Sequence, residues 1–209
     1  MKFVYILVEG ETEEKFVKDI LKPYFETKKI FLHPINLNGV SKYSIIKSEL
    51  QSLLKNQSFL LVTTMIDLYA CPSDMPKKTE INQDLNYIQK VTFLENAFSE
   101  DINNEKFLPY LQLHEFEALL FSDVSHFSFL SKDISYFENI IRTKEPEEIN
   151  DSPETAPSKR IILRIPQYKF TKPTNGIILA KKIGLEKMRE KCPHFNDWLD
   201  QIELRCSAS

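Results

Sequence analysis

The sequence has no long apolar run and few cysteines. No stretch of its 209 residues approaches the roughly 20 consecutive apolar residues that a helix needs to cross a bilayer. Its three cysteines are widely spaced and odd in number, which argues against a disulfide framework or a zinc site. The apolar run at residues 2–8 ends at Glu9 without a small-residue cleavage site, so we interpret it as a buried strand and not as a signal peptide. These absences predict a soluble, cytoplasmic protein with reduced thiols and no membrane partner.

The charged residues are unevenly distributed. The net charge of −3 argues against a general nucleic-acid coat protein. Residues 156–191, however, contain ten lysines and arginines against two acids, a local balance of +8, while the remainder of the chain carries −11. This basic segment could receive a phosphate backbone, or its charges could form ordinary solvated helix faces. The candidate nucleic-acid-binding residues are Lys159, Arg160, Lys181 and Lys182.

Short apolar runs alternate with segments of helical periodicity along the first 124 residues. Strands are expected at residues 2–8, 30–37, 58–66 and 107–113. Helices are expected at residues 11–25, 41–56, 82–98 and, as a short element, 114–121. This order predicts an α/β fold, a Rossmann-type, mostly parallel sheet flanked by helices. Pro34 within the second strand indicates that this strand lies at an edge or carries a bulge.

The chain is more helical and more charged from about Ser125 onwards. We therefore expect an α/β core at residues 1–124 and a helical C-terminal extension at residues 125–209, packed on the core. Residues 144–158 hold three prolines and many acids, which predicts a long surface loop.

Acidic side chains follow the first and third expected strands. Glu9 stands directly after the first strand and Asp67 ends the third. Right-handed crossovers bring the carboxyl ends of parallel strands to one edge of the sheet, where ligands of open α/β sheets bind. Two carboxylates held close together repel, and a hard divalent cation relieves that repulsion. We therefore expect Glu9 and Asp67 to share a Mg²⁺ or Mn²⁺ ion, with Gly10 allowing a tight turn beside them. The alternative for Glu9 is an ordinary strand–turn–helix with an acidic start.

A third acidic motif follows the fourth strand. On a helix beginning here, His114 and Glu117 would share a face and Glu115 would point away. Such a cluster could supply metal ligands or a general base, or it could be ordinary acidic residues in a first helical turn. We take Glu115 and Glu117 as further candidate metal ligands. The candidate catalytic residues are Glu9, Glu13, Asp67, His114, Glu117 and Lys159, the last as a group that could hold phosphate.

The motifs together resemble a known family. Val-Glu-Gly-Glu-Thr-Glu-Glu at 8–14, followed by an Asp at the end of the third strand, resembles the TOPRIM domain of topoisomerases, bacterial primases and overcoming-lysogenization-defect (OLD) nucleases. With the blocks at 114–121, 155–161 and 192–195, the chain is similar to a bacterial family of small standalone TOPRIM-like proteins of unknown function. TOPRIM domains usually carry Asp-x-Asp at the third strand. Here Tyr69 replaces the second acid, so one metal ligand is absent or supplied elsewhere.

The resemblance implies a Mg²⁺-dependent nuclease that hydrolyses phosphodiester bonds in DNA or RNA as part of bacterial phage defence. It also implies a partner ATPase, because the chain contains no P-loop. The alternative is a non-catalytic regulatory or binding subunit of an ATPase complex, which Tyr69 favours. A homo-oligomer is compatible with either function.

Overall fold

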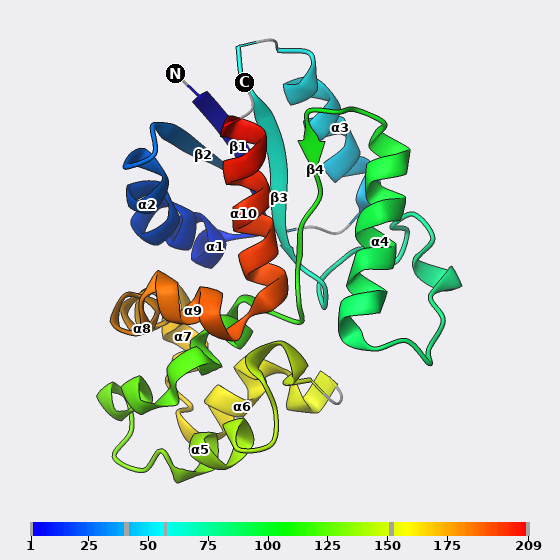
Figure 1. Ribbon diagram of the computed structural model, residues 1–209. Coiled ribbons are helices and arrows are strands. Elements are labelled where there is room, and N and C mark those ends of the chain that lie inside the picture. The colour runs from blue at the N-terminus through cyan, green and yellow to red at the C-terminus, as the bar shows by residue number, and fades with distance from the viewer. Residues whose placement is uncertain (1, 40–41, 57, 151–152, 208–209) are drawn as a thin grey trace.

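The computed structural model describes residues 2–39, 42–56, 58–150 and 153–207. A parallel sheet lies at its centre, between layers of helices (Figure 1). The strands are β1 (Lys2–Val8), β2 (Ile30–Asn36), β3 (Leu61–Asp67), β4 (Phe107–Leu108) and β5 (Leu111–Gln112). Their order is β2-β1-β3-β4, with β5 also paired to β3, and these pairings are all parallel. The expected α/β architecture is confirmed, and β2, which contains Pro34, is indeed an edge strand.

Helices cover both faces of the sheet. The connection from β1 to β2 consists of α1 (Glu11–Phe16), a π-helical turn η1 (Val17–Leu21) and α2 (Lys22–Glu26). The connections to β3 and β4 contain α3 (Tyr43–Leu54) and α4 (Tyr87–Ile102), with a short turn η2 (Lys78–Glu80) before α4. The chain first adds a strand on one side of β1 and then on the other. Because crossovers are right-handed, this reversal puts α3 and α4 on the opposite face from α1 and α2.

The packing of apolar side chains reflects these layers. Val4 and Phe16 belong to a cluster on the α1–α2 face, and Leu7 and Ile46 to a second cluster on the α3–α4 face. Successive residues of a strand point to opposite faces, so one apolar run supplies both clusters. The continuous apolar character of the strands therefore follows from burial on both sides.

The fourth expected strand is interrupted at Pro109, which separates β4 from β5. Proline has no N–H to donate to a strand ladder. Beside it, the Thr64 hydroxyl takes over this bonding: it accepts from the Tyr110 N–H at 3.0 Å and donates to the Tyr110 carbonyl at 2.8 Å. A side chain thus replaces the ladder where the backbone leaves it.

Most of the chain beyond β5 is helical, as expected. Its elements are η3 (Phe116–Phe129), α5 (Ser135–Ile141), η4 (Pro146–Glu148), η5 (Pro153–Thr155), α6 (Pro157–Arg164), α7 (Tyr168–Thr171), η6 (Lys172–Gly176), α8 (Ile177–Ile183), α9 (Leu185–Lys191) and α10 (Pro193–Ser207). The helices from α5 to α9 gather beyond the carboxyl end of the sheet, and α10 runs back along the sheet (Figure 1). The expected loop at residues 144–158 contains the short turns η4 and η5 and the start of α6, and residues 151–152 lie outside the described residues.

The last helix is part of the central core. Trp198 of α10 stacks on Tyr110 with 4.2 Å between ring centroids, and its indole N–H donates to the Thr63 hydroxyl of β3 at 2.8 Å. At the end of α10, the Cys206 carbonyl accepts a hydrogen bond from the Lys2 ammonium. Through α10, the C-terminal region packs directly on the sheet. In the part of the chain that the structure describes, no helix is long and apolar enough to cross a membrane.

Candidate metal-binding acidic site

The candidate site lies where the strand order reverses. Glu9 directly follows β1 and Asp67 is the last residue of β3, and these strands are neighbours, with Val8 opposite Met65. The connections that leave β1 and β3 pass to opposite faces, so the two strand ends lie at the switch point of the topology. Ligands of open α/β sheets bind at the carboxyl ends of strands beside such a point. The structure thus places Glu9 and Asp67 together at the edge that the sequence predicted.

Glu9 is a partly buried carboxylate with an unsatisfied oxygen. Burial raises its pKa, and a hydrogen bond from the Asp67 backbone partly opposes that shift. Among the described residues, its Oε2 atom has no hydrogen-bond partner although it is buried. Gly10 is the N-cap of α1 and has extended backbone (φ −151°), so the chain passes from β1 into the helix here without a left-handed residue. A Cβ atom at this position would lie 3.4 Å from Glu13 Oε2, an ordinary contact distance.

Asp67 and Glu13 complete the part of the site nearest the sheet. Asp67 Oδ1 accepts a hydrogen bond from the Phe116 N–H at 2.9 Å, and Glu13 Oε2 accepts one from the Gly10 N–H at 3.1 Å. Burial raises the pKa of Asp67 well above its usual range, and the charges of Glu13 and Glu9 raise it further. Burial and the charge of Glu9 likewise raise the pKa of Glu13. These shifts show that several carboxylates share one poorly solvated space.

Glu115 and Glu117 enter the same space from the start of η3. Glu115 accepts hydrogen bonds from the Ser158 N–H at 2.8 Å and the Ser158 hydroxyl at 3.1 Å, so it ties the site to the first turn of α6. The side chain of Glu117 is only 4% exposed and lies 3.1 Å from the Lys172 ammonium. Burial raises its pKa to about 7 against the opposing effect of Lys172. Both carboxylates also raise the pKa of Asp67.

The expected helical arrangement of His114 is wrong. His114 has a left-handed backbone (φ 66°), and the helix begins two residues later at Phe116 with Glu115 as its N-cap. His114 and Glu117 therefore do not share a helix face, and Glu115 does not point away from the site. The His114 ring contacts the Glu147 carbonyl at 2.9 Å and the Asn150 amide at 3.2 Å. These contacts fix the loop around η4, so its ring serves here to position that loop.

Two residues of the site carried no sequence signal of their own. Lys172 was one of ten basic residues in its segment, yet its charge acts on Glu9, Glu13 and Glu117 together. Tyr168 is fully buried, and burial and the charges of Glu117 and Glu115 raise its pKa. Tyr168 begins α7 and Lys172 begins the following turn η6, and the long-range packing of the helical region brings both to the sheet edge.

A glycine is required in that turn for a steric reason. A Cβ atom at Gly176 would come within 2.9 Å of the Tyr168 hydroxyl and 3.3 Å of the Phe116 ring. Because these atoms belong to buried rings that cannot yield easily, any larger residue at position 176 would displace Tyr168 from the carboxylates.

The four candidate nucleic-acid-binding residues lie on two helices. Lys159 is exposed at the start of α6, next to Ser158, and the Arg160 guanidinium donates to the Thr155 carbonyl at 2.7 Å. On α8, Lys181 forms an ion pair with Asp19 at 2.7 Å, and Lys182 lies over the Phe129 ring. The Ser158–Glu115 hydrogen bonds join the first turn of α6, and so the neighbouring Lys159 and Arg160, to the acidic site.

The oxygen-rich donor set suits a hard cation such as Mg²⁺. The buried Glu9 oxygen without a partner is where such an ion would find a free ligand. Within the described residues, however, no three acidic, histidine or cysteine side chains are already arranged as a metal-binding group. The Lys172 ammonium, the Ser158 hydroxyl and backbone N–H groups instead bind carboxylate oxygens of the site.

Comparison with known proteins gives a family but no activity. No curated protein and no solved structure shows significant similarity to the chain. One family model matches residues 8–203. The match extends from the end of β1 to the middle of α10 and includes every residue of the acidic site. The chain therefore belongs to the family described as "Domain of unknown function (DUF4276)".

Proposed function

We propose that the protein is a Mg²⁺-dependent, TOPRIM-like phosphodiester hydrolase that acts on nucleic acid. The observation that carries this proposal is the convergence of five carboxylates at the point where the strand order reverses. They are Glu9, Glu13, Asp67, Glu115 and Glu117. A structural acid is usually paired with a base or exposed to water. Apart from the Glu117–Lys172 ion pair, these acids share burial and repel one another, which is costly unless a cation is part of the working state.

The chain's own residues suit distinct roles in such a site. Glu9 and Asp67 would hold the ion, and Glu115 and Glu117 would complete its surroundings directly or through water. A bound Mg²⁺ neutralises charge on the phosphate and lowers the pKa of a coordinated water. Glu117 or Glu13 would accept the proton of the water that adds to phosphorus as the ester P–O bond breaks, and the leaving oxygen would take up a proton from solvent. Lys172 would then pair with a phosphate oxygen in place of Glu117.

The nucleic-acid surface that we propose begins at α6. Lys159 and Arg160 follow Ser158, which bonds to Glu115, so a phosphate backbone held there would lead towards the carboxylates. The resemblance to TOPRIM nucleases further supports a partner ATPase and a role in phage defence. Neither is needed for the chemistry of hydrolysis itself.

A second candidate is a non-catalytic binding subunit with the same acidic scaffold. Tyr69 favours it, because its side chain is 47% exposed at the position where TOPRIM domains carry their second acid. The Lys172–Glu117 ion pair also favours it, since an internal cation already balances part of the charge. Such a subunit would bind metal weakly or not at all.

Metal titration and cleavage assays separate the two functions. We expect Mn²⁺, followed by electron paramagnetic resonance, to bind the full chain and to lose affinity in Glu9→Gln and Asp67→Asn variants. Glu49→Gln removes the same charge from an exposed site on α3 and is the matched control. Metal-dependent cleavage of labelled DNA or RNA should likewise be retained by the native chain and Glu49→Gln and be lost in Glu9→Gln and Asp67→Asn. Metal binding without cleavage, even with the partner present, would favour the binding subunit, and equal Mn²⁺ affinity in all four proteins would refute the metal site.

A further inference from the structure

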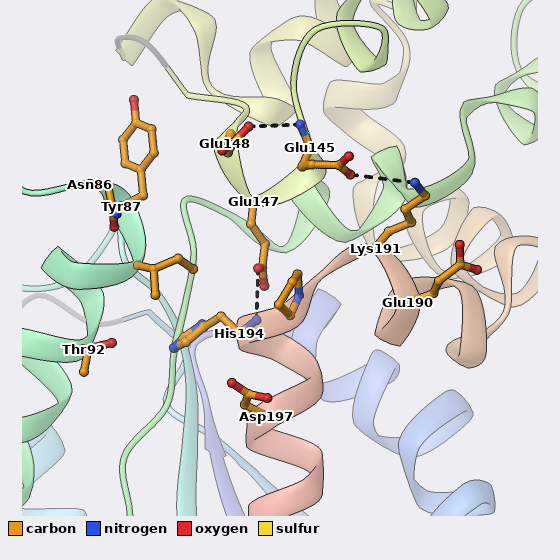
Figure 2. Close-up of a pocket in the computed structure, with 12 residues that line it drawn as sticks. Asn86, Tyr87, Thr92, Glu145, Glu147, Glu148, Glu190, Lys191, His194 and Asp197 are labelled. Carbon is orange, nitrogen blue, oxygen red and sulfur yellow. Dashed lines mark hydrogen bonds and ion pairs between the residues drawn. The ribbon is translucent and has the colours of Figure 1, made fainter.

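One cavity of the molecule is separate from the acidic site and plays no part in the proposed function. It is a cavity of about 470 Å³ between the start of α4, the turn η4 and the facing ends of α9 and α10. Figure 2 shows side chains from all four elements turned around this space. Its volume falls within the range of small-ligand pockets, about 300–1,000 Å³.

The wall of this cavity is acidic with an apolar section. Glu190 of α9 and Asp197 of α10 face it together with the glutamates of η4, against a single lysine, Lys191. Lys191 lies 3.9 Å from Glu145 and is therefore already balanced. Tyr87 and Ile88 of α4 supply the apolar part, and Ile88 is 41% exposed. Glu190 also pairs with Lys187 at 2.9 Å, and the Glu147 carboxylate accepts from the His194 and Phe195 N–H groups. The remaining acidic excess of the wall, carried by Glu148 and Asp197, favours a positively charged occupant.

His194 supplies a buried polar atom in the same wall. Its side chain is only 10% exposed, and Nε2 lies 3.1 Å from both carboxylate oxygens of Glu95. An ionised carboxylate only accepts hydrogen bonds, so the proton of the neutral ring is on Nε2 and Nδ1 is an acceptor. Among the described residues, Nδ1 has no hydrogen-bond partner although it is buried. In the neutral ring this buried acceptor can be satisfied by a donor on a bound ligand or by an ordered water.

We propose that this cavity binds a cationic nitrogen group, an alkylammonium or guanidinium on a short apolar stem. Its N–H groups would donate to His194 Nδ1 and to the carboxylates of Glu190 and Asp197. The stem would lie against Tyr87 and Ile88, which an inorganic cation would leave uncovered. The same chemistry is offered by a diffusible amine and by an arginine side chain of a protein partner.

Burial alone would lower the pKa of His194, but the hydrogen bond to Glu95 raises it. Because the pKa is raised, the ring is neutral only at higher pH, so ligand binding is measured at alkaline pH. The probes are agmatine, an acetylated tripeptide amide with a central arginine, and 1,4-butanediol as a neutral control, each followed by amide chemical shifts of the full chain up to about 10 mM. Shifts should concentrate on residues 86–92 and 190–197, and butanediol should produce none.

A charge-matched pair of variants tests the assignment. Asp197→Asn with Glu190→Gln removes two carboxylates from the wall, and Asp84→Asn with Glu49→Gln removes two exposed ones elsewhere. We expect the first variant to bind roughly three- to tenfold more weakly than the second. Binding of agmatine and the peptide supports both sources, and binding of the peptide alone assigns a protein partner. Binding of agmatine alone assigns a diffusible amine. Absence of binding by both probes, or equal affinity of the two variants, overturns the proposal. None of these outcomes bears on the proposed metal site, because the carboxylates replaced here do not belong to it.

Discussion

The Lys172 ammonium lies 3.1 Å from a carboxylate oxygen of Glu117, and this ion pair joins the turn after α7 to the start of η3. The lysine side chain is one-third exposed, and the glutamate is almost fully buried. Burial alone would lower the pKa of Lys172, but the charge of Glu117 raises it. The pair therefore balances part of the carboxylate charge when no metal is bound.

Replacing Lys172 tests this balance. Lys172→Met keeps much of the side-chain length and removes the charge, so Glu117 and its acidic neighbours lose a cation. We expect the free energy of unfolding in EDTA at pH 8 to fall by about 1–2 kcal/mol, discounted for the exposure of the lysine. Urea unfolding measures it, with the exposed Lys169→Met as control. Mg²⁺ should restore more stability to Lys172→Met than to the control, and a stable variant that is indifferent to Mg²⁺ would contradict the charge-balance role.

The raised pKa of Glu117 predicts how stability depends on pH. Because its folded-state pKa is about 7 against a usual 4.5, the folded protein binds this proton more tightly than the unfolded chain does. Stability from this group is therefore present at low pH and falls as pH rises from about 4.5 to 7. At about 1.4 kcal/mol per pH unit the loss is at most ~3.5 kcal/mol. Chemical unfolding in EDTA across this range should show the loss in the native protein and a smaller one in Glu117→Gln. Parallel pH profiles of the two would show that Glu117 does not titrate there.

The strands and their acidic ends were predictable because they depend on local sequence. The apolar runs of β1 and β3 are buried on both faces, and Glu9 and Asp67 are the first charged residues after each run. Lys172 was not predictable in this way, since it reaches the site only through the packing of the helical region. His114 misled the helical interpretation because a left-handed residue leaves no trace in the periodicity of its neighbours.

Replacing Glu9 with an uncharged residue distinguishes a metal-binding role of its carboxylate from a structural role. Glu9→Gln keeps an oxygen for the Asp67 backbone hydrogen bond and removes repulsion with the other carboxylates. We expect its melting temperature in EDTA to equal or exceed that of the native protein, and Mg²⁺ to raise it less than it raises the native value. Differential scanning calorimetry measures both. A variant destabilised by ~1 kcal/mol or more would instead indicate a structural carboxylate.

Removing one partner of the Trp198–Thr63 hydrogen bond should destabilise the fold more than the bond itself stabilises it, because the other partner stays buried. Trp198→Phe leaves the buried Thr63 hydroxyl without its donor and should lower the free energy of unfolding by about 1–3 kcal/mol, including lost contacts with Tyr110. Thr63→Val added to Trp198→Phe should recover part of that loss, because both polar partners are then absent. Urea unfolding of the two single variants and the double variant gives the coupling energy. Strict additivity would show that α10 is held by packing alone.

The two basic helices should contribute unequally to nucleic-acid binding. Lys159 and Arg160 adjoin the acidic site through Ser158, whereas Lys181 is already paired with Asp19 on α1's continuation η1. We therefore expect Lys159→Ala with Arg160→Ala to weaken DNA binding more than Lys181→Ala with Lys182→Ala, although each pair removes two charges.

Fluorescence anisotropy over a range of salt concentrations measures both the affinity and its salt dependence. Each lost phosphate contact should flatten the log–log slope by roughly 0.9 for duplex DNA. The α6 variant should lose up to two such contacts. The α8 variant should lose fewer, because Lys181 already forms an ion pair with Asp19. Unchanged affinity and slope in both variants would remove the basic segment from the binding surface and leave the acidic site without its proposed approach.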